Sequence, residues 1–340
     1  MSAGLVVRRL EDSDRERWDA YVARAPGSHF GQTMAWMELT REAFGCEPDY
    51  RLAESDGAVR GVLPLFLKRK GVLFSPPGGM LADDEAAAQA LLAPARDRVL
   101  RERLDYLELR DQPRAWGELE TNGEHCTLQL ELAPDTDAQW KGLDAKLRNQ
   151  IRKGQKSGFT VRWGRERPDL FYRVFLECMR DLGTPILGAR YFRRALELLG
   201  PRAELLLLED RGEPAGVMFV VTHADTLVDP WAASLRRYFP RCPNQVLYWE
   251  AIQYAIRSGL RRFDFGRSQW NSSTFRFKEQ WGAKPVPLYY QYALGREASM
   301  PSLEAQKHGL GLAVAAWKRL PLPVAGALGP RVRRMFPEAL

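Results

Sequence analysis

Two long stretches of the chain resemble each other at a nearly constant spacing, and this repeat limits the fold more than any other feature. The stretches are YRLAESDGAVRGVLPLFL and ELLLLEDRGEPAGVMFVV, each with two apolar runs around an acidic turn that contains glycine. Aligning Gly61 with Gly216 offsets them by 155 residues, and the upstream pair that ends at Gly45 and Gly200 has the same offset. A downstream pair, RERLDYLELR and RSGLRRFDFGR, is offset by 157 residues. Three matches in one order predict a duplicated domain.

Hydrophobic periodicity predicts the same order of elements in both halves: two helices, a β-hairpin, a further strand, a long helix and a last strand. We therefore expect an α/β chain, in which each half is an α+β mixed sheet covered by helices. A strand (125–132) and a basic helix of about 137–156 lie between the halves. The expected domains are a first domain (1–135), a basic linking helix (136–158), a second domain (159–296) and a basic amphipathic tail (297–340).

Composition excludes several classes of protein. The chain begins MSAGLVVRRLEDSDRE, which turns charged too soon for a signal peptide, and no apolar run is long enough to span a bilayer. We therefore expect a cytoplasmic protein. The four cysteines form no CxxC pair and the four histidines have no metal-ligand spacing, so inert thiols and no metal site are expected.

The stretch FDFGRSQWNSSTFRFKEQWGAKPVPLYY (263–290) combines an apolar strand with charged residues. Asp264 interrupts the strand, and a buried carboxylate is costly unless it has a partner. Arg267 follows the strand and is the candidate partner, either in a cleft or in an ion pair that fixes the strand end. Lys278 lies on a predicted short helix, and a solvated surface lysine is the simplest interpretation from residue type alone.

Two basic clusters predict anion binding. In AKLRNQIRKGQKSGF (145–159), Arg148, Arg152 and Lys156 share one helix face, where like charges repel unless phosphate or protein carboxylates compensate them. In the second cluster, Arg237 and Arg241 precede a helix. Its expected N-cap is Asn244, and arginines at a helix N-terminus favour phosphate. For both clusters, simple solvation of the basic side chains is the alternative.

With SPPGGMLADDEAA (75–87), these motifs resemble the FemAB-like branch of the GNAT acyltransferases over most of residues 1–295. More narrowly, the chain is similar to short two-domain members associated with exopolysaccharide and exosortase-type systems. The resemblance implies tandem GNAT-like domains and transfer of an acyl or aminoacyl group to an amine of a cell-envelope precursor, as in peptidoglycan or exopolysaccharide synthesis. It places Phe277 and Lys278 at the reacting centre, where the ammonium would stabilise an oxyanion by about 3–4 kcal/mol.

The resemblance also implies partners. The donor would be aminoacyl-tRNA, whose acceptor end would be bound, or acyl-CoA, with no tightly bound cofactor and no metal. The loop before the second long helix lacks the glycines that hold the coenzyme A pyrophosphate in ordinary GNAT enzymes. The acceptor would be a phosphorylated precursor, a nucleotide- or lipid-linked sugar. Two alternatives stay open: an acyl-CoA-dependent N-acetyltransferase acting on a small amine, and a non-catalytic RNA- or lipid-binding protein on the same fold.

Several assignments stay open at this point. Trp231 and Tyr248 either line a substrate pocket or belong to the core. The candidates for a general base are Asp264, Glu250, Glu279 and Asp229, and spacing distinguishes none of them. The segment 309–335 mixes apolar residues with five Lys and Arg, and either packs on the protein or rests on the inner face of the plasma membrane. Its prolines exclude one continuous helix.

Overall fold

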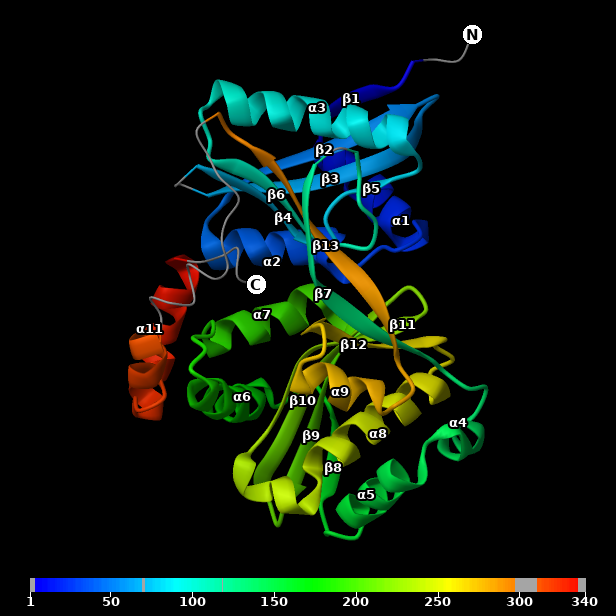
Figure 1. Cartoon of the computed structure of the whole chain (residues 1–340), viewed down its shortest axis with the longest axis vertical. Helices are drawn as coiled ribbons and strands as arrows, with labels where there is room; N and C mark the ends of the chain where they lie inside the picture. The colour runs from blue at the N-terminus through cyan, green and yellow to red at the C-terminus, as the bar shows by residue number, and fades with distance from the viewer. Residues whose placement is uncertain (1–3, 69–70, 118, 297–310, 336–340) are drawn as a thin grey trace. The chain divides into compact units, whose positions relative to one another are not determined.

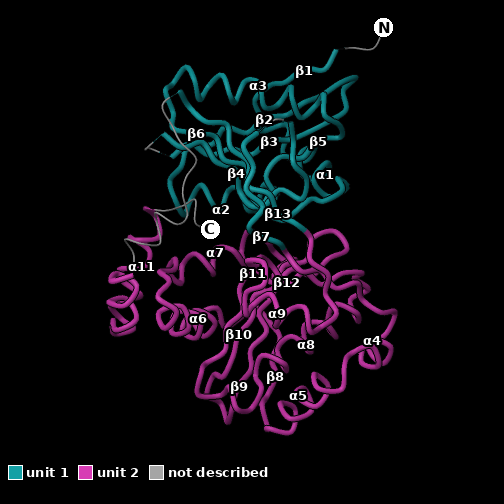
Figure 2. The backbone as a smooth tube through the Cα atoms, in the orientation of Figure 1, with its two compact units in different colours: residues 1–126, 287–302, 337–340 teal, residues 127–286, 303–336 magenta. Residues whose placement is uncertain are grey.

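The computed structural model describes residues 4–68, 71–117, 119–296 and 311–335. The chain forms two compact units, shown in Figure 2. Unit 1 comprises residues 1–126, 287–302 and 337–340, and unit 2 comprises residues 127–286 and 303–336. The chain passes from one unit to the other within two strands, β7 (Glu120–Glu131) and β13 (Lys284–Leu294).

Unit 1 is a mixed sheet with helices on both faces (Figure 1). Its strands lie in the order β1-β2-β3-β4-β6-β13, with β5 beside β3. The chain order is β1 (Val6–Arg9), α1 (Arg15–Arg24), α2 (Met34–Phe44), β2 (Glu47–Ser55), β3 (Ala58–Lys68), β4 (Val72–Pro77), β5 (Leu81–Ala82), α3 (Glu85–Arg101) and β6 (Tyr106–Gln112). Two short 3-10 helices flank α1, η1 (Asp12–Asp14) and η2 (Phe30–Gln32).

Alternation along β3 explains the two faces of unit 1. Val62 and Phe66 pack with α1 and α2 in one hydrophobic cluster. Leu63 and Leu65 pack with α3 in a second cluster on the opposite face. Successive side chains of a strand point to opposite faces of its sheet, so a strand that is apolar at nearly every position is buried on both sides.

Unit 2 repeats this order of elements. Its strands lie in the order β7-β12-β11-β10-β9-β8, and helices α6 and α8 pack on the central strands (Figure 1). The chain order is α4 (Thr136–Gly142), α5 (Ala145–Gln155), β8 (Thr160–Gly164), α6 (Pro168–Leu182), α7 (Ala189–Leu199), η3 (Gly200–Arg202), β9 (Ala203–Asp210), β10 (Glu213–His223), β11 (Thr226–Ser234), η4 (Arg236–Arg241), α8 (Pro243–Arg257), β12 (Arg262–Gln269) and α9 (Ser273–Glu279). The predicted mixed α/β fold with a tandem repeat is confirmed.

The basic segment between the halves forms two helices where the sequence predicted one. Helix α4 ends at Gly142, and the Asp144 side chain accepts a hydrogen bond from the backbone N–H of Leu147 to begin α5. An N-capping aspartate has non-helical backbone angles, so it separates two helices that the charge pattern alone would join.

The described part of the tail also belongs to unit 2. Residues 311–317 are helical, and α11 (Leu322–Met335) follows and packs on α6. Among the residues that the structure describes, no helix is both long and apolar enough to cross a membrane.

Candidate active site

The candidate active site lies in unit 2, where the parallel strands β11 and β12 stop pairing. Their ladder joins Thr226 to Arg262 and ends at the pair Val228 and Asp264. Both strands continue for several residues beyond this pair. In unit 1 the corresponding parallel strands, β4 and β6, still pair at Pro77 and Arg110, near the end of β4. Two strands that separate expose backbone groups of their inner edges, so the fork of unit 2 offers polar contacts that the closed pair does not.

A bulge and a glycine shape the fork. The register between β10 and β11 shifts between the pairs Phe219–Trp231 and Val221–Val228, so β11 holds one extra residue at Asp229 and Pro230. Opposite, Gly266 of β12 has φ of +73°, and a Cβ there would lie 2.7 Å from the Asp229 carbonyl oxygen. Bulges commonly redirect side chains at functional sites, and a glycine allows the close approach of two backbones.

Lys278 is buried at this fork. Its side chain comes from α9 and its residue is 4% exposed, so the interpretation as a solvated surface lysine is wrong. The ammonium donates hydrogen bonds to the carbonyl oxygens of Gly266 (2.8 Å) and Arg267 (3.1 Å). These carbonyls follow the last pair that β12 forms with β11, so the ammonium supplies donors where that ladder has ended. Lys278 therefore places a positive charge at the fork and holds the diverging strand.

Asp264 is also buried, but its partners differ from the predicted one. Its carboxylate accepts hydrogen bonds from the Thr127 hydroxyl, from Gln129 Nε2 at 2.9 Å and from the backbone N–H of Gly266 at 2.7 Å. The side chain of Arg267 is exposed. Thr127 and Gln129 lie on β7, more than 130 residues earlier, and sequence analysis missed them because long-range strand pairing leaves no local pattern.

Asp229 combines burial with an incompletely bonded carboxyl. The Tyr248 hydroxyl of α8 donates to Oδ2 at 2.7 Å. Oδ1 has no well-aligned hydrogen-bond partner among the described residues. Burial raises the pKa of Asp229 to about 7, against the lowering effects of the Tyr248 hydrogen bond, the Lys278 charge and the Trp231 backbone N–H. The charge of Asp264 adds to the rise. A carboxyl group with a pKa near neutrality can accept or release a proton under physiological conditions.

The predicted aromatic residues lie in two places. The Tyr248 ring stacks on Phe265 at 5.3 Å and meets Phe277 edge-on at 5.2 Å, so Phe277 packs beside the residue that holds Asp229. The Trp231 ring contacts Phe192 and Phe219 at about 5 Å in an aromatic cluster. Phe277 and Tyr248 thus join the fork, whereas Trp231 packs against aromatic side chains of α7 and β10.

The loop before α8 differs from the predicted anion site. Helix α8 begins at Pro243, and its N-cap is Cys242 in a left-handed conformation without a side-chain cap. The prediction of Asn244 as the N-cap is therefore wrong. Proline is favoured at the first helical position, so the helix begins at Pro243 and its N-cap lies two residues before the predicted one. Arg237 pairs with Glu177, and Arg241 forms a bidentate pair with Asp210. Either arginine would have to leave its carboxylate to bind a phosphate.

Helix α5 carries the second predicted cluster. Leu147 and Ile151 are buried, while Arg152 and Lys156 are exposed and Arg148 is half-buried. In the described part of the chain, none of these three basic side chains lies within ion-pair distance of a carboxylate. Arg152 lies over the Trp140 ring at 5.2 Å. The Cα of Gly154 lies close to the start of α8, since a Cβ there would approach the Cys242 carbonyl oxygen to 2.9 Å.

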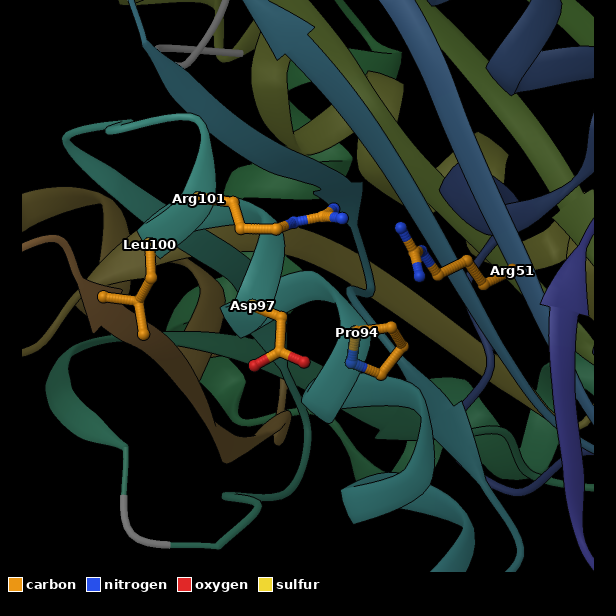
Figure 3. Close-up of a pocket in the computed structure, with 5 residues that line it drawn as sticks. All are labelled: Arg51, Pro94, Asp97, Leu100 and Arg101. Atoms are coloured by element: carbon orange, nitrogen blue, oxygen red, sulfur yellow. The ribbon is translucent and has the colours of Figure 1, made fainter.

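The remaining candidates lie outside the fork. Glu279 is exposed on α9, and Glu250 is half-buried on α8, where burial raises its pKa. Figure 3 shows a pocket of unit 1 between α3 and β2, lined by Arg51, Pro94, Asp97, Leu100 and Arg101. It contains none of the predicted site residues. Within the described ranges, no three His, Cys, Asp or Glu side chains form a group that could hold a metal.

Comparison with known proteins finds a matching family model and several solved structures of similar fold. Residues 143–279, which include α5, the fork and Lys278, match the family model of the GNAT acetyltransferase domain. The structure titled FemX has a TM-score of 0.68 at 16% identity, covering 85% of this chain and 97% of its own. A tandem GNAT protein from the clavulanic acid biosynthesis pathway has a TM-score of 0.56 at 14% identity, covering 86% and 98%. L-PGS from Bacillus licheniformis has a TM-score of 0.57 at 12% identity, covering 92% and 99%. No match was found among the curated proteins.

Proposed function

Since this chain is a GNAT acyltransferase with the fold of the FemAB-like enzyme FemX, we propose that it transfers an aminoacyl group to an amine of a phosphorylated cell-envelope precursor. The observation that carries the proposal is the buried Lys278 ammonium at the fork of β11 and β12. A cation fixed in a site that excludes water can stabilise the oxyanion of a tetrahedral acyl-transfer intermediate.

Asp229 is the favoured proton acceptor among the four candidates. Asp264 already accepts three hydrogen bonds, Glu279 is exposed, and Glu250 lies outside the fork. Asp229 has one oxygen without a well-aligned donor and a pKa of about 7. It would take a proton from the acceptor ammonium so that the amine can attack the donor carbonyl. The new C–N bond forms as the ester C–O bond breaks. The attacking nitrogen then gives up a second proton, which the released hydroxyl receives, while the first proton leaves Asp229 for solvent.

One observation favours aminoacyl-tRNA over acyl-CoA as the donor, and a second favours a phosphorylated partner, either donor or acceptor. The loop 235–242 contains no glycine and forms the 3-10 helix η4, unlike the glycine-rich loop that binds pyrophosphate. Helix α5 offers Arg148, Arg152 and Lys156, whose charges no protein carboxylate compensates in the described part of the chain. Such a face suits the phosphates of an RNA backbone or of a nucleotide- or lipid-linked sugar.

The test is a transfer assay with the purified full chain. Aminoacyl-tRNA and acetyl-CoA are supplied in turn, with nucleotide-linked and lipid-linked amino sugars as acceptors, and mass spectrometry detects the product. An aminoacyl mass added to an envelope-type acceptor is the expected result. Acetylation of a small amine from acetyl-CoA alone would instead establish the simpler N-acetyltransferase, which the family model also favours. No product from any pair would contradict the proposed enzyme.

Two variants separate the charge of Lys278 from its structural contacts. Lys278→Gln keeps hydrogen-bond donors near the two carbonyls but removes the positive charge. Lys278→Ala removes both. We expect kcat to fall by roughly 100-fold or more in both variants. Only Lys278→Ala should also lose about 1–3 kcal/mol of unfolding free energy, because it removes the donor to the Gly266 and Arg267 carbonyls. Full activity of Lys278→Gln would exclude the electrostatic role.

A further inference from the structure

Helix α11 packs on unit 2 through its smallest residues. Ala325 and Gly329, one turn apart, are buried. A Cβ at Gly326 would lie 3.2 Å from Leu176 Cδ2 of α6, and one at Gly329 would lie 2.7 Å from the Ile186 carbonyl oxygen. Arg180 of α6 also donates a hydrogen bond to the Leu320 carbonyl at 2.6 Å, just before the helix begins. Close approach through small residues fixes which face of α11 is inward.

Leu322 and Val332 of the helix are half-buried, whereas three other large apolar residues point outward. Val324 and Leu328 are each 39% exposed and Met335 is 57% exposed. Residues 324, 328 and 335 follow each other at intervals of four and seven, which places them on one side of a helix. In the preceding helical segment, Leu312 is 88% exposed. A surface helix normally turns its large apolar side chains to the core, so an outer face that carries several of them indicates a contact with another surface.

The charge of the segment has a single sign. Residues 311–335 contain five basic residues and neither Asp nor Glu. Lys318, Arg319 and Arg331 are exposed, and Arg331 lies one turn beyond Leu328 on the same outer face. A second copy of this chain would bring a like positive charge against these residues, which opposes self-association through this face. A partner with anionic groups at its surface and an apolar layer beneath them would contact the basic and the apolar side chains at the same time.

We propose that the outer face of residues 311–335 docks on an anionic lipid bilayer. Val324, Leu328 and Met335 enter the headgroup region, while Lys318, Arg319 and Arg331 contact lipid phosphates. The sequence left open whether the segment packs on the protein or rests on the membrane, and in this proposal it does both. Its small residues hold it to unit 2, and its large apolar residues contact the membrane. The inference is independent of the group that the enzyme transfers, since no residue of the fork takes part.

The test is co-sedimentation of the full chain with vesicles of phosphatidylcholine alone or with 30% phosphatidylglycerol, a composition of roughly the charge density that basic segments recognise. We expect binding to the anionic vesicles, weakening with salt, and little binding to the neutral ones. Lys318→Gln with Arg319→Gln and Arg331→Gln should lower the partition coefficient by about fivefold for each cation removed. Val324→Ser with Leu328→Ser should lower it by at least about tenfold at unchanged charge.

The matched control is a triple variant that removes three exposed basic side chains of unit 2 outside the tail. It combines Lys141→Gln, Arg257→Gln and Lys284→Gln. This control should bind anionic vesicles nearly as tightly as the wild type. Equal losses in the control and in the tail variant would overturn the proposal, and so would no binding of the wild type at low salt. Sedimentation equilibrium supplies the remaining outcome. If the wild type is a dimer and the double variant Val324→Ser with Leu328→Ser is a monomer, this face binds a second copy of the chain. That result would reject the lipid surface.

Discussion

Asp229 lies where three elements of unit 2 act on one carboxyl group. Strand β11 buries it at a bulge, α8 supplies the Tyr248 hydroxyl, and α9 supplies the positive charge of Lys278. Burial dominates, so its pKa of about 7 lies above the ordinary value of 3.8. Tyr248 is itself buried and its pKa is also raised, so the hydroxyl stays protonated and keeps donating to the carboxyl.

The raised pKa predicts how stability depends on pH. Between about pH 4 and 7 the folded state keeps a proton on Asp229 that the unfolded chain releases, so this group makes the folded state less stable as pH rises. Asp229→Asn cannot lose that proton and still offers an oxygen to Tyr248. Its unfolding free energy relative to the wild type should therefore increase from pH 5 to pH 8, by about 3 kcal/mol. Denaturant titrations at both pH values measure this difference, and equal differences would show an ordinary pKa.

Four residues that the sequence analysis singled out lie near one another at the fork, although their contacts there differ from those expected. Lys278, Phe277, Asp264 and Tyr248 all lie there. The predicted partner of Asp264 was Arg267, three residues later in the sequence, but its donors on β7 come from a strand that only the folded sheet brings alongside. The local sequence pattern could not predict the burial of Lys278 either. Its burial depends on backbone carbonyls of β12 that no longer pair with β11 once the two strands separate.

At the level of elements, the repeat predicted both halves but not how they differ. Helix pair, hairpin, strand, helix and strand recur in each unit because the same apolar periodicities recur. The parallel pair remains joined to Pro77 and Arg110 in unit 1 and opens after Val228 and Asp264 in unit 2. Unit 1 also has a register shift, between Phe74 and Pro77, so a bulge alone does not open the pair. Neither a bulge nor a left-handed glycine such as Gly266 changes the hydrophobic pattern from which elements are predicted.

Gly266 allows a direct test of the fork. Gly266→Ala would place a Cβ at positive φ and only 2.7 Å from the Asp229 carbonyl oxygen. Gly259 has nearly the same φ, +72°, with no atom within 4 Å of a Cβ, so Gly259→Ala measures the backbone cost alone. We expect a loss of roughly 1–2 kcal/mol for Gly259→Ala and about 2–5 kcal/mol for Gly266→Ala. Thermal or denaturant unfolding gives both values, and kcat should fall in Gly266→Ala alone. Equal stability losses would mean that the two strands do not approach closely.

At the scale of the molecule, two segments of unit 2 carry basic side chains in different surroundings. On α5, Arg148, Arg152 and Lys156 accompany a polar helix face beside the start of α8. On the tail, Lys318, Arg319 and Arg331 accompany large exposed apolar side chains. A net charge of +7 does not distinguish these surfaces, whereas the side chains that accompany each one do. The basic face of α5 therefore suits phosphate groups alone. The tail suits a surface that has both negative charge and an apolar interior.

Two triple variants with the same charge change should therefore have opposite effects. Replacing Arg148, Arg152 and Lys156 by Gln should raise KM for the tRNA donor or the phosphorylated acceptor by about tenfold or more at low salt. The effect should shrink as salt screens the charges, and vesicle binding should stay as in the wild type. Replacing Lys318, Arg319 and Arg331 by Gln should weaken vesicle binding while KM for a water-soluble acceptor stays unchanged. Steady-state kinetics and co-sedimentation on the same preparations decide the matter. If both variants impaired both readouts equally, net charge alone would explain the two surfaces, and separate roles for α5 and the tail would have to be abandoned.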